Sequence, residues 1–313
     1  LAEEVEPGRF EFRPPLHQPR LYDDVEVPNL FFENGRYYLL GSIREDTKVH
    51  YWQADELDGP YQNFFDNVLL PSGNYAARIC QVGDETLLFN FFAIEEHYYG
   101  QRISRKLLPP PKLLTTDATG RLRLKSYRGF DQLVTETQSM PEPASLDRLF
   151  ANPLAKATGD SDELHLACVS GYEAFLLPGE YESFRLKTTL ALEGLGKCGM
   201  VLRVNDEGDG YYLSLDLLKG VAQMRAWGRS AEADKEYAFN YRQLQAGYFV
   251  SRDAGPWGLE IVAHGTYLEV SINGSVILSL VDETYATGRI GFYCESSKIM
   301  IASQGVERLS TPK

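Results

Sequence analysis

The stretch VEVPNLFFENGRYYLLGS, residues 25–42, carries the strongest local structural signal in the sequence. Two aromatic-rich runs, 29–32 and 36–43, stand on either side of the dipeptide Asn34-Gly35. Asn-Gly is favoured in two-residue hairpin turns because both turn residues adopt a positive φ, and aromatic residues favour strands. The stretch therefore predicts an antiparallel β-hairpin.

Further strands extend this hairpin into a sheet. KVHYWQA (48–54) is expected to form a third strand and VLLP (68–71) a fourth. Residues 28–71 then make an antiparallel meander of about 45 residues, which is the size of one propeller blade. Two further units of the same kind are expected over residues 76–109 and from residue 112 to 127, without any convincing helical periodicity between them.

The second half of the chain predicts a β-sandwich. Residues 162–313 contain short strands at intervals of roughly 8–12 residues, separated by turn-forming residues. The most regular part is GLEIVAHGTYLEVSINGSVILSL (258–280), two linked hairpins with alternating apolar and polar residues. Residues 132–161 are rich in Pro, Ser and Thr and are expected to link this sandwich to a first domain of residues 1–131.

The composition is that of a two-domain globular protein. The chain has 313 residues, of which 43% are hydrophobic and 24% charged, and a domain commonly holds roughly 100–200 residues. Its net charge of −13 would repel nucleic acid phosphates and anionic membrane surfaces, so neither is expected as a partner. The four cysteines and five histidines show no metal-ligand spacing, so no metal or cofactor is predicted.

Glu26 is the candidate for acid–base chemistry. It lies two residues before Pro28, which fixes the entry to the first strand of the meander. In a propeller the first strand of each blade lines the central channel, so the Glu26 side chain would face a shared pocket. A carboxyl group held there among acidic and aromatic side chains suits a general acid, whereas an acidic surface loop is the plain structural alternative.

The segment 25–42 resembles the acid/base segment of the five-bladed propeller glycosidases of glycoside hydrolase families 32 and 43. In these families a Glu, one residue and a Pro precede an aromatic strand, a Gly turn and a Tyr-Tyr-Leu strand. VHYWQADELDGPY (49–61) and LPPPKLLTTDATGRLRLKSYRGF (108–130) resemble later parts of such propellers. The resemblance covers roughly residues 21–131. It implies an all-β fold in which a partial five-bladed β-propeller, of about three blades, precedes the sandwich.

The resemblance also implies a glycoside hydrolase that acts on the O-glycosidic bonds of a carbohydrate substrate. Glu26 matches the general acid/base glutamate of the families, which protonates the glycosidic oxygen. A retaining, β-fructosidase-like reaction of the family 32 type is the first expectation, and an inverting arabinosidase or xylosidase of the family 43 type is the second. The alternative from another class is a carbohydrate-binding or assembly protein without catalysis.

The sequence departs from these families in the remaining carboxylates. Family 32 enzymes place a nucleophilic and a stabilising Asp before proline, and this chain contains no Asp-Pro dipeptide. Asp23 and Asp24 are too close in sequence to Glu26 to reach the opposite face of a sugar, where a second carboxylate must act. We therefore expect a second polypeptide to supply the missing blades and carboxylates. A non-catalytic remnant is the alternative.

Five residues are candidates for substrate binding. Asp24 lies beside the candidate acid. His50 and Trp52 alternate along one strand and share a face, on which Trp52 would either stack on a sugar ring or pack between blades. Asn74 and Arg78 open the next blade and would hydrogen-bond sugar hydroxyls, or Arg78 would serve as a buried structural arginine.

The C-terminal part resembles the concanavalin-A-like sandwiches appended to family 32 propellers. VLRVNDEGDGYYLSLD (201–216) and the double hairpin of residues 258–280 carry this resemblance. Such modules act as structural buttresses or bind carbohydrate, and the sequence leaves both roles open.

Overall fold

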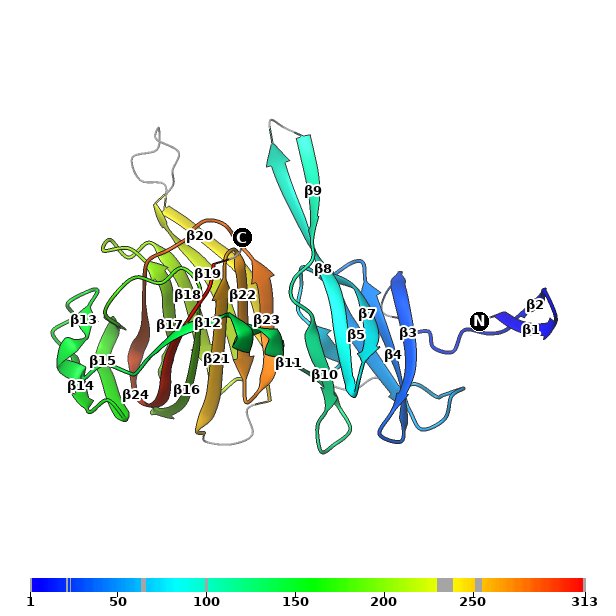
Figure 1. Cartoon of the computed structure of the whole chain (residues 1–313), viewed down its shortest axis with the longest axis horizontal. Helices are drawn as coiled ribbons and strands as arrows, with labels where there is room; N and C mark the ends of the chain where they lie inside the picture. Colours follow the sequence, from blue (N-terminus) through cyan, green and yellow to red (C-terminus); the bar gives the residue numbers. More distant parts are fainter. Residues whose placement is uncertain are drawn as a thin grey trace. The chain divides into compact units, whose positions relative to one another are not determined.

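The computed structural model describes residues 2–20, 22, 24–62, 66–98, 101–229, 239–250 and 255–311. In these residues the chain is almost entirely β-structure, with two short 3-10 helices, η1 (Arg128–Leu133) and η2 (Pro143–Ser145). None of the helices in the described ranges is long and apolar enough to cross a membrane. The chain divides into two compact units, Leu1–Leu124 and Lys125–Lys313, both rich in strands (Figure 1).

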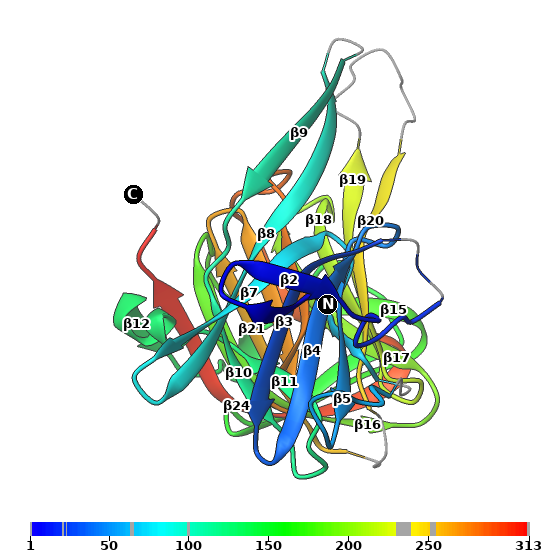
Figure 2. The ribbon, with the colours of Figure 1, turned by 90° about the vertical axis from the view of Figure 1, so that its right-hand side faces the viewer.

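The first unit contains the predicted meander. Its antiparallel sheet has the order β3-β4-β5-β6, formed by β3 (Val25–Glu33), β4 (Arg36–Ile43), β5 (Lys48–Ala54) and β6 (Val68–Leu70). Figure 2 shows β3, β4 and β5 side by side. The predicted hairpin is confirmed, because the turn dipeptide Asn34-Gly35 has φ values of 47° and 82°.

A second antiparallel sheet follows in the first unit, and it contains β7 to β11. β7 (Asn74–Val82), β8 (Glu85–Tyr98), β10 (Lys112–Thr116) and β11 (Leu122–Lys125) lie in the order β11-β10-β8-β7. β9 (Gln101–Leu107) pairs with the far half of β8. The described residues thus form two blade-like sheets where about three were expected. The reason is that β8 is long enough to pair with both β9 and β10.

The chain enters this unit through a separate hairpin. β1 (Ala2–Glu6) and β2 (Arg9–Phe12) form a two-stranded sheet of their own. Isolated two-stranded hairpins are marginally stable in water. Here an ion pair from Arg13 Nε to Glu3 Oε2, at 2.6 Å, ties the end of the hairpin to its first strand.

The second unit is the predicted sandwich. Nine strands of its sheet lie in the order β20-β19-β18-β17-β24-β16-β21-β22-β23, and β12, β13, β14 and β15 pair off this path. The strands are β12 (Val134–Gln138), β13 (Asp147–Arg148), β14 (Ala155–Gly159), β15 (Glu163–Leu176), β16 (Phe184–Glu193), β17 (Lys197–Val204), β18 (Gly210–Asp216), β19 (Val221–Arg229), β20 (Phe239–Tyr248), β21 (Trp257–His264), β22 (Tyr267–Ile272), β23 (Ser275–Val281) and β24 (Arg289–Leu309).

The long strand β24 divides this sheet into two leaves. Its first part pairs with β17 and its last part with β16, so β17 to β20 form one leaf and β16 with β21 to β23 form the other. Apolar side chains such as Leu213, Met224 and Ile261 fill the core between the leaves. The outermost strands of the two leaves meet, because Gln245 on β20 exchanges two hydrogen bonds with Ser279 on β23, at 2.9 and 2.7 Å.

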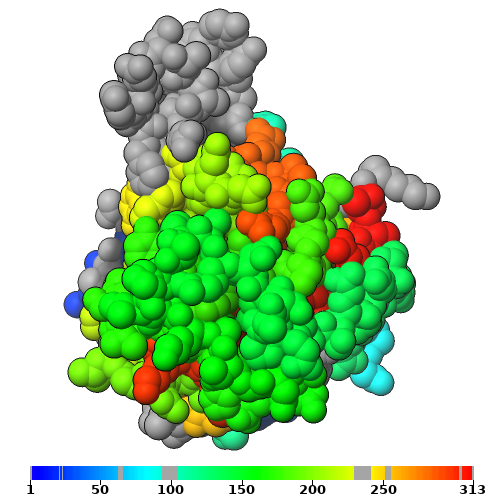
Figure 3. Space-filling view, turned by 90° about the vertical axis from the view of Figure 1, so that its left-hand side faces the viewer, coloured from blue at the N-terminus to red at the C-terminus, as the bar shows by residue number. Residues whose placement is uncertain are grey.

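Residues 132–161 are part of this second unit and correct the expected linker. β12 pairs with β24, and β13 and β14 pair with β15. In Figure 3 the green segment that contains these residues lies over the surface of the unit. The Pro and Ser residues that suggested a linker occupy η2 and the turns between these short strands. The division between the units accordingly falls after Leu124, before the expected boundary at residue 131.

Candidate active site

Glu26 lies at a distortion in β3. Glu26 pairs with Ser42 of β4, and Asn29 pairs with Leu40. An advance of three residues along β3 is thus matched by only two along β4, so β3 has a β-bulge between Glu26 and Asn29. Val27 within the bulge has a φ of 57°, a conformation that is strained for a β-branched residue. Bulges re-aim side chains and are common next to active sites, as is stored backbone strain.

The next sheet repeats this distortion at the same place. On β7, Tyr75 pairs with Phe91 of β8 and Arg78 pairs with Phe89. Three residues along β7 are again matched by two along its partner strand. Ala76 is the counterpart of Val27 and has a φ of 52°. Tyr75 is therefore the structural counterpart of Glu26, and Arg78 is the counterpart of Asn29.

Hydrogen bonds join the two bulged strands. The side-chain amide of Asn29 donates to the carbonyl of Ala77 at 2.8 Å and accepts from the backbone N–H of Ile79 at 3.4 Å. Arg78, whose side chain is exposed, donates to the carbonyl of Pro28 at 3.0 Å. These bonds fix the position of β7 against β3 and so bring the counterparts Glu26 and Tyr75 together.

Two groups hold the Glu26 carboxylate. The Tyr75 hydroxyl donates a hydrogen bond of 2.7 Å to Glu26 Oε2. The guanidinium of Arg44, in the turn after β4, lies 3.7 Å from Glu26 Oε1 and donates to Asp24 Oδ2 at 2.9 Å. The Glu26 side chain is 35% exposed. The carboxylate is therefore oriented from two sides while remaining open to a ligand.

The hydroxyl of Tyr75 stays protonated in this arrangement. Burial, followed by the hydrogen bond to Glu26 and the negative charge of that carboxylate, raises the pKa of Tyr75 to about 12. Each of these influences disfavours the phenolate. At neutral pH Tyr75 is thus a neutral donor that orients one carboxylate oxygen of Glu26.

Of the predicted substrate-binding residues, His50 and Trp52 lie in the core of the first sheet. Trp52 is fully buried and packs with Ile43, Ala54 and Tyr61. His50 is also buried and bonds through Nε2 to Asp46 Oδ2 at 3.0 Å. Trp52 is thus a packing residue, but these partners belong to its own sheet, whereas the expected alternative was packing between blades. The physical reason is that β5 lies inside its sheet, with side chains packed on both of its faces.

The Asp46 carboxylate belongs to this buried arrangement. Burial acts to raise the pKa of Asp46, but the hydrogen bond and charge of His50, together with Lys48, outweigh it and lower the pKa. The pair therefore holds the turn before β5 and stabilises the sheet.

Asn74 is likewise a structural residue. It is fully buried, donates to the carbonyl of Pro71 at 3.0 Å, and accepts from the side-chain amide of Asn90 at 2.9 Å. Its polar atoms fasten the start of β7, and a sugar hydroxyl has no access to them. Asp24 and Arg78, by contrast, lie beside the Glu26 bulge, although both hold protein partners.

Sequence reasoning did not find Tyr75 and Arg44. Strict alternation along β7 puts Asn74 and Arg78 on one face and Tyr75 on the other, and the bulge breaks that alternation. The sequence feature that could have indicated Tyr75 was the similarity between the first residues of β3 and those of β7, the strands that begin the two sheets. Arg44 gave no signal, because an arginine in a turn is ordinarily a solvated residue.

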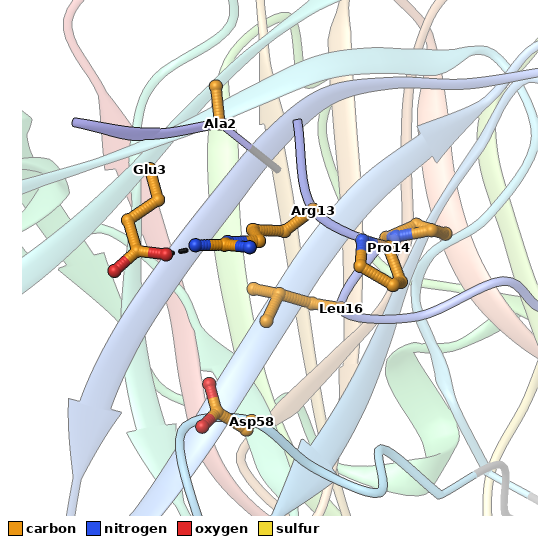
Figure 4. A pocket seen from close by; sticks show the side chains of 7 residues that line it. Ala2, Glu3, Arg13, Pro14, Leu16 and Asp58 are labelled. Carbon is orange, nitrogen blue, oxygen red and sulfur yellow. Dashed lines mark hydrogen bonds and ion pairs between the residues drawn. The ribbon is translucent and has the colours of Figure 1, made fainter. Parts of the chain in front are cut away.

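A cavity of ≈ 540 Å³ lies elsewhere in the first unit, under the N-terminal hairpin (Figure 4). It is lined by Ala2, Glu3, Arg13, Pro14, Pro15, Leu16 and Asp58. None of the predicted site residues is among them. Two of its charged groups are paired with each other, since Arg13 Nε lies 2.6 Å from Glu3 Oε2.

Comparisons with known proteins place the fold. No family model matches the sequence, and no curated protein matches it. Among solved structures, the chain is similar to a GH32 β-fructofuranosidase of Bombyx mori in complex with sucrose, with 16% identity and a TM-score of 0.54 over 92% of this chain and 55% of that one. A fructosyltransferase of A. japonicus gives 11% identity and a TM-score of 0.59, over 92% and 57% of the two chains.

A further structure, A. japonicus CB05, gives 10% identity and a TM-score of 0.62, over 92% of this chain and 56% of that one. At such identities the similarity concerns the fold alone. This chain spans between 55% and 57% of the length of these proteins. The chain therefore has the fold of part of a family 32-like glycosidase, a partial β-propeller followed by a β-sandwich.

Proposed function

We propose that this chain is part of a glycoside hydrolase that cleaves β-fructosides, with Glu26 as its general acid/base. The observation that carries the proposal is the placement of Glu26: a half-exposed carboxyl group, at a strained bulge, oriented by Tyr75 and Arg44. The likeness of the fold to a β-fructofuranosidase and a fructosyltransferase supports the choice of substrate class.

Glu26 would act by proton transfer. A general acid donates its proton to the leaving glycosidic oxygen as the bond breaks, and then takes a proton from water as a base. Tyr75 donates to Oε2, so the proton that moves to the substrate would be carried by Oε1. Arg44, which is shared with Asp24 and lies 3.7 Å from Oε1, would stabilise the carboxylate that remains once the proton has left.

The second carboxylate would come from outside this sequence. Retaining enzymes place their two carboxyl groups about 5–5.5 Å apart and inverting enzymes about 6.5–9.5 Å apart. The chain contains no Asp-Pro dipeptide of the family 32 kind, and it spans little more than half of the enzymes with which it shares the fold. We propose that a further length of polypeptide, joined to this chain or separate, completes the propeller and supplies that group.

The experiment is a hydrolysis assay on the protein purified from its source with everything that accompanies it. Sucrose and inulin are the fructoside substrates, and an arabinofuranoside is the comparison. Glu26→Gln should lower the release of fructose by about 10²–10⁴-fold, and the matched variant Glu33→Gln, at the other end of the same strand, should leave it unchanged. Full activity of Glu26→Gln excludes Glu26 as the acid. Arabinose release in place of fructose release assigns the family 43-like alternative, and no hydrolysis at all favours a binding protein.

A further inference from the structure

The first sheet is covered on one of its two faces by the second sheet. Tyr38 and Leu40 on β4 and Tyr51 on β5 point to this covered face, and all three are fully buried. The Tyr38 hydroxyl donates a hydrogen bond of 2.6 Å to the carbonyl of Gly120, in the turn between β10 and β11 of the second sheet. This side of the first sheet is therefore closed to further partners.

The other face of the first sheet carries a group of large side chains that remain exposed. Leu30 and Phe32 on β3 pair with Leu39 and Tyr37 on β4, and these four side chains alternate with those of the covered face. Leu30 is 42% and Phe32 58% exposed, while Tyr37 and Leu39 are half-buried. We call these four residues the open face. A contiguous apolar patch of this kind commonly marks a surface at which a partner packs.

The chain before β3 covers only the far part of this same side of the sheet. Trp52 on β5 pairs with Leu39, so it shares the side of the open face, and the ring of His17 packs against it with a centroid distance of 5.0 Å. Leu16 lines the cavity beneath the N-terminal hairpin together with Asp58, in the loop after β5 (Figure 4). The hairpin therefore lies beside the loop after β5, and the β3 side of the sheet is left open.

The order of the strands shows what the N-terminal hairpin corresponds to. In the first sheet β3, β4, β5 and β6 are neighbours in chain order, and β6 leads directly into β7, the first strand of the second sheet. The hairpin β1–β2 precedes β3 in the same way, so β1 and β2 correspond to β5 and β6, the last two strands of a sheet. Among the described residues β1 pairs only with β2, which leaves its other edge without a partner strand. A sheet of this order still requires two strands on that edge, the counterparts of β3 and β4.

We propose that two antiparallel β-strands, from polypeptide directly upstream of β1, pair with the free edge of β1 and pack on the open face. This inference rests on the part of the proposed function that calls for further polypeptide. β4 and β5 are neighbours joined by the turn of residues 44–47, so the counterpart of β4 would be joined to β1 by a short turn as well. The completed sheet would then cover Leu30 and Phe32 as the second sheet covers Tyr38 and Leu40.

The proposed occupant meets two requirements at once. The backbone donors and acceptors on the free edge of a strand pair readily with another strand, and the open face, which has no charged member, is matched by apolar side chains. Sheets stack face to face at a distance of about 10 Å, so one side of each incoming strand should be apolar. A second copy of this chain meets only one of these requirements, because packing of two open faces against each other leaves the edge of β1 unpaired.

The test is hydroxyl-radical footprinting, read by mass spectrometry, on the protein purified from its source. Leu30 is compared with two other leucines: Leu40, which is buried on the covered face, and Leu195, which is 89% exposed in the second unit. We expect Leu30 to lose its oxidation and to react as slowly as Leu40. Oxidation of Leu30 midway between these two references, as its exposure in this chain alone demands, overturns the proposal.

Substitution provides a second measurement. Phe32→Asp places a charge on the open face, and Val82→Asp, at a similarly exposed position on β7, is the matched control. In urea titrations of the protein from its source, Phe32→Asp should lower the unfolding midpoint, and Val82→Asp should leave it nearly unchanged. Equal midpoints of the two variants overturn the proposal, and the footprint of the unsubstituted protein decides the question where Phe32→Asp fails to fold.

The outcomes are distinguishable from those of the catalytic proposal. Glu26→Gln should leave the footprint of Leu30 unchanged whether or not it loses hydrolysis. A protected Leu30 in a protein without glycosidase activity supports the docking surface and rejects the catalytic proposal, whereas an oxidised Leu30 in an active enzyme does the reverse. Protection by a second copy of this chain or by a separate polypeptide, each detected by mass spectrometry of the cross-linked protein, overturns the assignment to upstream polypeptide.

Discussion

Tyr75 and Glu26 occupy the same position in two successive sheets, and the hydroxyl of one donates a hydrogen bond of 2.7 Å to the carboxylate of the other. The orientation of each side chain results from a β-bulge whose next residue has a positive φ. The repeat of the backbone distortion thus places a donor beside a carboxylate. Neither residue would reach the other from a regular strand, because the bulges set the direction of both side chains.

Tyr75→Phe removes the donor and leaves the ring in place. A hydrogen bond to a charged group contributes about 1.5–3 kcal/mol, so we expect kcat to fall by roughly 10- to 100-fold while the fold stays intact. The measurement is steady-state hydrolysis of a fructoside. Tyr61→Phe is the control, since that hydroxyl bonds to the carbonyl of Leu57, in the loop after β5. Equal activity of both variants would show that Tyr75 does not position Glu26.

The ionisation of Tyr75 predicts an alkaline loss of stability. Its pKa is raised to about 12 in the folded protein, against an ordinary value near 10 in the unfolded chain. The folded state therefore holds the proton more tightly, and its stabilising effect is present below pH 10 and lost as pH rises toward 12. Denaturant titrations over this range should show a shallower decline for Tyr75→Phe than for the unsubstituted protein. An identical decline would contradict the assignment.

The positive φ of Ala76 predicts that glycine is favoured at this position. Ala76→Gly relieves the left-handed strain, and we expect a gain of about 0.5–1 kcal/mol in the free energy of unfolding. Ala77→Gly is the matched control, because Ala77 is buried and has no positive φ. That substitution should destabilise the protein. If the two substitutions have the same effect in urea titrations, β7 has no bulge at this position.

The burial of Trp52 separates its packing role from sugar stacking. Trp52→Ala should lower the free energy of unfolding by about 3–5 kcal/mol, the range for a large aromatic side chain removed from a core. Val82→Ala, at an exposed position at the end of β7, should change it by only about 0.5 kcal/mol. A Trp52→Ala protein of unchanged stability that no longer binds substrate would restore the stacking interpretation.

The proposed completion of the propeller predicts additional polypeptide. A partial propeller exposes sheet faces and unpaired strand edges, and such edges readily pair with further chain. Mass spectrometry of the protein from its source should find either a longer continuous chain or a second chain that stays bound under native conditions and separates under denaturing ones. A single species with the mass of this sequence alone would exclude the completed propeller.

Much of the fold follows from local sequence pattern. The Asn34-Gly35 turn, the alternation in residues 258–280 and the absence of helical periodicity predicted the hairpin, the sandwich and the all-β class. These features depend on neighbours in sequence, so the sequence reports them directly. The pairing of β10 with β8 and the docking of β12 to β24 depend on partners far along the chain, and local pattern does not encode them.

The candidate site was only partly predictable for a related reason. Glu26 was found by resemblance, but its partner Tyr75 depends on two bulges whose central residues, Val27 and Ala76, are not residue types that favour positive φ. The burial of His50 and Trp52 depends on the packing of whole sheets. Residue type and alternation put both residues on one face, and they left open whether Trp52 stacks on a sugar or packs against other residues.

The dependence of the rate on the leaving group tests the central claim, that Glu26 is the general acid, most directly. Sucrose and an aryl fructoside with an acidic phenol as leaving group should be compared for the unsubstituted protein, Glu26→Gln and Glu33→Gln. General acid catalysis contributes about 10²–10⁴-fold, so Glu26→Gln should lose that factor in kcat/KM on sucrose and retain most of its kcat/KM on the aryl fructoside, whose leaving group departs without protonation. An equal loss on both substrates, or no loss on sucrose, would contradict the role of Glu26.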